Sequence, residues 1–109
     1  MNRKQLVIQS ALAQARRLRE AYGAPQVIGL SIYETNDDLR QLRPEDGPAA
    51  TTAQQRRIVD AVAAALRADG HLVKLITLRV VDYLKWLTET GKSNTPAHRA
   101  EWINWNTTR

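Results

Sequence analysis

The first long pattern in the chain has the period of an α-helix. In residues 3–22 the apolar side chains recur every three or four positions and share a face about 140° wide, the width expected of a helix that lies on a core. They belong to Val7, Ile8, Ala11, Leu12, Ala15, Leu18 and Tyr22. Gly23 tolerates the left-handed backbone that ends a helix, and Pro25 cannot continue one. The pattern predicts a helix over residues 3–22.

Two shorter apolar runs predict strands. Residues 27–33 are too few for a helix and are rich in β-branched and aromatic side chains, and Gly29 within them can admit a close neighbour. Residues 72–77 are apolar except for Lys74, as in a strand that is covered on both faces.

A second amphipathic helix is predicted between these strands. Thr52, followed by Gln55, fits a capping box, and Gly70 ends the helix. The apolar face consists of Ile58, Ala61, Val62, Ala65 and Leu66. Two strands separated by one helix predict a βαβ unit with parallel strands and a right-handed crossover.

Residues 34–51 are predicted to form a long, partly irregular connection. A short helical piece through Leu39 and Leu42 precedes a cluster of turn residues around Pro44 and Gly47, although a third strand in this segment is an open alternative. Two strands leave sheet edges that this connection or a second subunit would cover.

Two more helices complete the prediction, over residues 79–90 and over residues 95–106, with Thr95 as the cap of the last. The expected fold is therefore α/β: a small single domain spanning residues 1–109. Its order is α-β-(short α)-α-β-α-α, with helices packed on a two- or three-stranded sheet.

Composition and charge narrow the class of protein. The chain has 109 residues, no cysteine and a net charge of +5, so disulfides and thiolate metal sites are excluded. We expect a cytoplasmic location and no membrane span, because no window approaches the roughly 20 apolar residues that a span needs. Residues 26–50 carry five acids against two bases, whereas both flanking parts are basic. This layout is typical of surfaces that meet within the fold or across a dimer, although an uneven layout also occurs with no structural meaning.

The end of the central helix resembles a known junction. Residues 66–73 contain a leucine, three residues, Gly70-His71, one residue and a valine, similar to the helix-to-strand junction of nucleotide- and sugar-nucleotide-binding α/β domains such as glycosyltransferases. The resemblance implies a nucleotide- or sugar-nucleotide-binding fragment. In those domains a glycine-rich turn before the helix binds phosphate. Here that segment carries Glu45, Asp46 and Pro48, so the two carboxylates are expected to repel a phosphate.

Catalytic and metal-binding patterns are missing from the sequence. The two histidines, His71 and His98, do not have the spacing of zinc ligands, and no serine or histidine sits in a nucleophile motif. We therefore expect no enzyme activity, no metal and no cofactor.

Two groups of residues remain as candidate contact surfaces. His98, Trp102 and Trp105 form one stripe of the last helix, which predicts either a core latch or an interaction surface. The candidate interaction surface comprises Trp102, Trp105, His98, Trp86 and Arg99. The candidate contacts for a polyanion are Arg3, Lys4, Arg16 and Arg17.

The sequence thus favours a small non-catalytic binding module whose partner is another protein or a second copy of the chain. A basic nucleic-acid-associated protein is the alternative, and a nucleotide-binding fragment is third.

Overall fold

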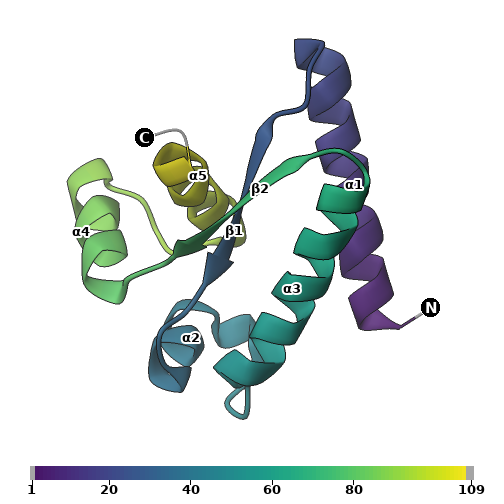
Figure 1. The fold of residues 1–109 in the computed structure, drawn as a ribbon. Coiled ribbons are helices and arrows are strands. Elements are labelled where there is room, and N and C mark those ends of the chain that lie inside the picture. Colours follow the sequence, from purple (N-terminus) through teal and green to yellow (C-terminus); the bar gives the residue numbers. More distant parts are fainter. Residues whose placement is uncertain (1, 108–109) are drawn as a thin grey trace.

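The computed structural model describes residues 2–107 and confirms the predicted α/β class and element order. The elements are α1 (Arg3–Tyr22), β1 (Val27–Ile32), α2 (Asn36–Leu42), a short 3₁₀ turn η1 (Pro44–Asp46), α3 (Thr52–Ala68), β2 (Leu72–Thr77), α4 (Val80–Thr90) and α5 (Pro96–Thr107). Figure 1 shows the strands in the middle, α1 and α3 side by side on one flank, and α4 and α5 on the other.

The sheet consists of two parallel strands within the described residues. β1 pairs with β2 from Val27 opposite Leu72 to Ile32 opposite Thr77, and the crossover between them contains α2, η1 and α3. The segment that the sequence left open between a short helix and a third strand forms a short helix and a turn. Residues 2–107 therefore add no third strand to the sheet.

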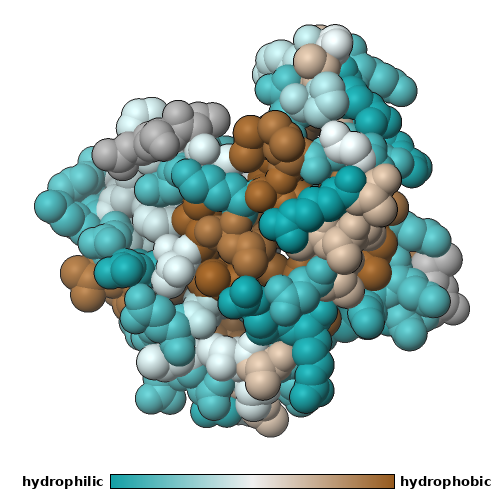
Figure 2. Space-filling view, viewed as in Figure 1, coloured by the Kyte–Doolittle hydropathy of each residue, from teal (hydrophilic) through white to brown (hydrophobic). Residues whose placement is uncertain are grey.

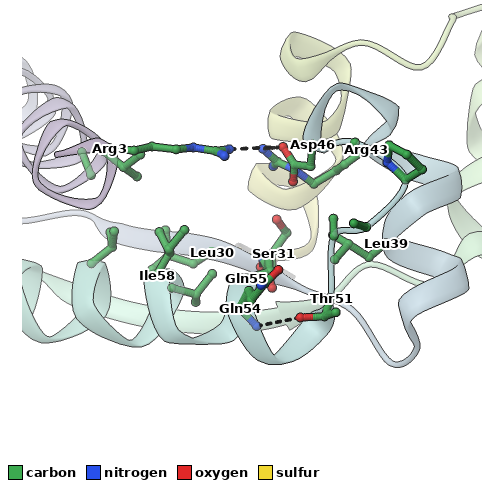
Figure 3. A pocket seen from close by; sticks show the side chains of 18 residues that line it. Arg3, Leu30, Ser31, Leu39, Arg43, Asp46, Thr51, Gln54, Gln55 and Ile58 are labelled. Atoms are coloured by element: carbon green, nitrogen blue, oxygen red, sulfur yellow. Dashed lines mark hydrogen bonds and ion pairs between the residues drawn. The ribbon is translucent and has the colours of Figure 1, made fainter.

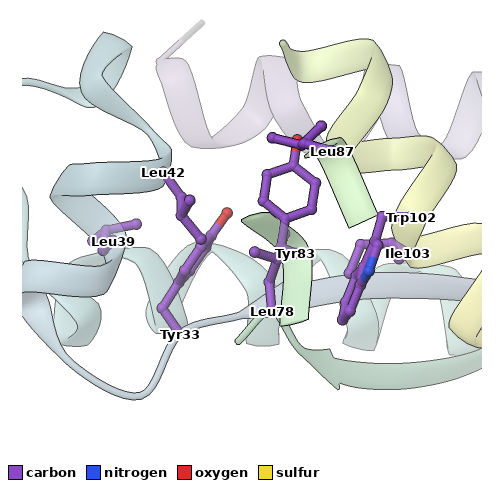
Figure 4. Packing of buried hydrophobic residues seen from close by; sticks show 8 residues of the cluster. All are labelled: Tyr33, Leu39, Leu42, Leu78, Tyr83, Leu87, Trp102 and Ile103. Carbon is purple, nitrogen blue, oxygen red and sulfur yellow. The ribbon is translucent and has the colours of Figure 1, made fainter. Parts of the chain in front are cut away.

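The register places the two faces of the sheet against two separate cores. Ile28 and Leu30 of β1, with Val73 of β2, pack toward α1 and α3. The larger core lies around Tyr83 and joins α2, α4 and α5 (Figure 4). Its buried members are Tyr33, Leu39, Leu42, Leu78, Tyr83, Leu87, Trp102 and Ile103.

The start of α3 differs from the prediction by one residue. Thr51 is the cap, and its hydroxyl oxygen accepts the backbone N–H of Gln54 at 3.2 Å. The predicted capping box of Thr52 and Gln55 is wrong, because both residues have other partners. Asn36 accepts the backbone N–H of Thr52 at 2.8 Å, and the Gln55 amide donates to the Ser31 carbonyl at 3.0 Å.

Gly29 admits α5 directly onto β1, as its place in the strand predicted. A Cβ atom at this position would lie 2.0 Å from Thr107 Oγ1 and 2.8 Å from Ile103 Cγ2. These separations are far inside van der Waals contact, so only glycine permits this approach. The contact holds α5 against the face of β1 opposite to α3.

We predict that Gly29→Ala lowers the free energy of unfolding by about 1–3 kcal/mol, because the added methyl overpacks the contact with α5. Denaturant unfolding followed by circular dichroism measures this loss. In a Thr107→Ala background the penalty should shrink, because the nearest clashing atom is gone. An equal penalty in both backgrounds would refute the steric explanation.

Candidate functional site

The two-stranded sheet is narrower than the helix layer that covers one of its faces. Packed helices lie about 8–10 Å apart, whereas paired strands lie about 4.8 Å apart. α3 contacts both strands, and α1 packs chiefly against α3. α1 therefore extends past the edge of β1 that has no paired strand.

A hollow of about 340 Å³ opens along this unpaired edge. Residues 27–31 of β1 line it one after another, whichever face they point to, as expected of a strand edge seen from the side. Residues of α1, including Leu18, form one wall, and Ala100 and Ile103 of α5 belong to the other. The edge of β1 is thus flanked by a helix on each face of the sheet.

A second hollow, of about 500 Å³, continues the first toward the start of α1. The two hollows share Ala11, Leu30, Ser31 and Arg43. Figure 3 shows the second hollow, with Leu30 and Ile58 on one side and Arg3 reaching from α1 toward Asp46 across it. We refer to the two hollows together as the β1 groove.

The walls of the β1 groove include part of the apolar face predicted for α1. That face is only partly covered: Ala15 is buried, but Leu18 is 40% exposed and Val7 is 37% exposed. Leu18 and Val7 both line the groove. The sequence predicted this face correctly as apolar but could not show that a strand is missing beneath it.

The other edge of the sheet is less suited to pairing. This edge is not polar throughout, because Leu72 of β2 is exposed. Figure 2 shows hydrophobic side chains gathered in the middle of this face of the molecule, with hydrophilic ones around them. However, β2 carries the exposed Lys74 in its centre, and a charged residue in an edge strand discourages pairing. β1 contains no charged residue.

Arginines neutralise the acidic residues beside the groove. Arg43 Nε donates to Asp46 at 2.8 Å, and Arg3 pairs with the same carboxylate at 3.4 Å. Arg99 forms an ion pair with Glu45. The sequence predicted that the carboxylates of Glu45 and Asp46 would repel a phosphate. Because arginines pair with both carboxylates, this prediction needs correction.

The start of α3 nevertheless offers little to a phosphate. The backbone N–H groups of Thr52 and Gln54 are taken by the side chains of Asn36 and Thr51. A phosphate-binding turn needs such amides to be available. The geometry gives the nucleotide-binding alternative no added support.

The tryptophan stripe is divided between the core and the surface. Trp102 is 7% exposed and meets Tyr83 edge to face, with ring centroids 6.1 Å apart. Trp86 is half-buried, stacks on Tyr83 and lies 4.9 Å from Lys92 Nζ. Trp105 is 57% exposed. The three tryptophans line a third hollow, of about 450 Å³, between β2, α4 and α5.

His98 and Arg99 act within the fold. The His98 backbone N–H donates to Thr95 Oγ1 at 3.1 Å, and its ring Nδ1 lies 2.7 Å from the Ser93 carbonyl oxygen. Arg99 is only 5% exposed and donates to the Leu42 carbonyl at 2.8 Å. Arg99 therefore joins α5 to the end of α2 and presents no charge to a partner.

Half of the candidate polyanion contacts have acidic partners in the fold. Arg16 donates twice to Asp69, at 3.0 Å each, and Arg3 pairs with Asp46. Lys4 and Arg17 form no ion pair within residues 2–107. Three of the five acids of residues 26–50 form ion pairs within residues 2–107: Asp46 with Arg3 and Arg43, Glu45 with Arg99, and Glu34 with Arg79 at 3.6 Å. Part of the uneven charge layout is therefore met within the fold.

The sequence predicted that a two-stranded sheet has edges to cover, but it gave no sign of Arg43, which lines both hollows of the groove. Arg43 lies in a stretch of turn residues, and no neighbouring residue indicates a binding role.

No profile of a known protein family matches this chain, and no curated protein matches it. Within residues 2–107 no helix is long and apolar enough to cross a membrane, and no cluster of His, Asp or Glu is placed to hold a metal.

The Arg16–Asp69 pair predicts a defined pH dependence. The hydrogen bond from Arg16 is the main cause that lowers the pKa of Asp69 from 3.8 to about 2. A lowered pKa in the folded state contributes stability above the unfolded value, and this is lost as the pH falls toward 2. We expect Asp69→Asn to be less stable than the wild type at pH 6 and to approach it near pH 2, measured by urea unfolding.

Asp60→Asn provides the control, because it removes the same charge from an exposed pair with Arg56 on one helix. Its effect on the free energy of unfolding should be smaller at pH 6 than that of Asp69→Asn. A loss at Asp69 that stays constant from pH 6 to pH 2 would contradict the assignment.

Proposed function

We propose that this protein is a non-catalytic binding module that accepts an extended segment of a partner protein as a third strand beside β1. The observation that carries this proposal is the unpaired edge of β1, which lies in a groove between α1 and α5. An unpaired strand edge presents main-chain donors and acceptors, and an added strand satisfies them. The Ser31 carbonyl at the end of β1 already accepts the Gln55 amide, so an added strand pairs with the positions before it or displaces this amide.

The flanking helices determine what can enter the groove. α1 already occupies the helix layer over the vacant strand position, and α5 occupies the opposite layer. The occupant must therefore be a bare extended chain. A second copy that brought its own β1 or β2 to this edge would also bring α1 or α3 to a place that α1 fills. This favours a peptide over sheet-to-sheet dimerisation.

The dimensions suit a short peptide. The stretch of α1 from Arg3 to Leu18 that borders the groove is about 22 Å long at the rise of an α-helix. An extended chain covers that length with about six or seven residues. β1 itself has six residues. Apolar groove walls would receive alternate side chains, while the main chain pairs with β1.

We predict that peptides selected from a random octapeptide library bind the wild-type protein and that Ala100→Trp weakens this binding at least tenfold. Ala100 is an exposed residue of the groove wall, so an indole there fills the space for the strand. Ala64→Trp, at an exposed position of α3 that lines none of the three hollows, is the matched control. Isothermal titration calorimetry measures the dissociation constants.

Two results would overturn the proposal. One is that no peptide is enriched on the wild-type protein over a blank surface. The other concerns two variants of a bound peptide, each methylated at one alternate set of backbone nitrogens. Unchanged affinity of both variants would overturn the proposal, because strand pairing requires the N–H groups of one of the two sets.

A further inference from the structure

We propose that the bound strand runs parallel to β1 and is the C-terminal tail of its partner, whose terminal carboxylate binds Arg43 and Arg3. This inference rests on the proposed function and names the chemistry of the partner. It follows from the unequal ends of the β1 groove.

The wider end of the groove lies at the C-terminal end of β1. The 500 Å³ hollow there is lined by Leu30 and Ser31 from the second half of the strand, by the start of α1 and by the start of α3. A peptide that runs parallel to β1 brings its C-terminus to this hollow. A hollow of this volume lies within the range of small-molecule and ligand-group sites.

The charges at this end favour a carboxylate. Two guanidinium groups, those of Arg3 and Arg43, share the single carboxylate of Asp46. Asp46 engages one edge of Arg43, through Nε and Nη2. Arg3 is 71% exposed and holds Asp46 at 3.4 Å, so this exposed pair is weak and Arg3 can turn to a ligand at small cost. An N-terminal ammonium group at the same place would meet uncompensated positive charge.

The walls of this hollow specify the last side chain. Val7, Leu30 and Ile58 line it from α1, β1 and α3, and the charged groups lie at the Arg3–Asp46 side (Figure 3). Uncharged polar side chains, those of Ser31, Thr51, Gln54 and Gln55, lie on the side of Leu30 and Ile58. A large aliphatic or aromatic side chain would pack on the three apolar residues while the carboxylate beside it meets Arg43. The partner tail therefore ends in a large apolar residue with a free carboxylate.

The test uses two random octapeptide libraries, both attached through their N-termini, one ending in a free carboxylate and one in an amide. We expect enrichment from the free-acid library, with large apolar residues at the last position, and at least tenfold weaker binding of the amidated form of each selected peptide. Fluorescence anisotropy at low and at 1 M salt should show the difference shrinking with salt, since it is electrostatic.

Variants of the protein assign the effect to the two arginines. Arg3→Gln, at an exposed position, should weaken the free-acid peptide several-fold and leave the amide unchanged. Asp46→Asn should tighten the free-acid peptide several-fold, because it removes the competing carboxylate from both arginines. A merely structural role of Asp46 would not produce tighter binding.

The outcomes separate the two proposals. Equal enrichment of both libraries, or equal affinity of acid and amide peptides, would overturn the carboxylate inference and leave strand addition standing. Binding that requires an internal Asp or Glu side chain but no free terminus would also overturn it. Enrichment from neither library would overturn the proposed function, and this inference with it.

Discussion

The structure depends on a difference in width between two packed layers: the helix layer of α1 and α3 is wider than the two-stranded sheet beneath it. Parallel strands need a crossover helix and cover on both faces, and here α3 supplies the crossover while α1 packs beside it. Two helices side by side span a wider layer than two strands. The excess helix surface covers a strand position that residues 2–107 do not fill. The groove, the exposed apolar residues of α1 and the unpaired edge of β1 all follow from this one constraint.

Helix α5, on the other face of the sheet, is held in place by a close contact with the β1 backbone and by the interactions of the buried Arg99. Gly29 lets α5 approach β1, and Arg99 ties α5 to the carbonyl of Leu42 and to Glu45. Arg99 is the buried partner of this pair, so the loss of Glu45 would leave a buried charge uncompensated. These contacts make α5 a firm wall for the groove. They also explain why the tryptophan-bearing helix contributes Trp102 to the core and leaves mainly Trp105 to solvent.

The same ion pairs bear on the choice between a protein partner and a nucleic acid. A polyanion-binding face needs cations whose charge is not already satisfied, because phosphate contacts dominate such binding. Arg16 is held by Asp69 and Arg99 is buried, whereas Arg3 is held only weakly by Asp46, and Lys4 and Arg17 form no ion pair within residues 2–107. The groove, by contrast, combines apolar walls, an open strand edge and a local excess of positive charge at one end.

The sequence by itself determined the elements and their order, since helix periodicity, short β-branched runs and the Gly23 and Gly70 stops act over neighbouring residues. It also indicated the parallel pairing and the close approach at Gly29. Only the tertiary structure decided where charges and aromatic rings ended up: Arg99 and Trp102 inside, Trp105 outside, and Arg43 at the centre of a groove. Local patterns state which residues are apolar or charged, but burial depends on which distant segment lies opposite. A vacant strand position has no residues of its own, so no pattern in the chain could announce it.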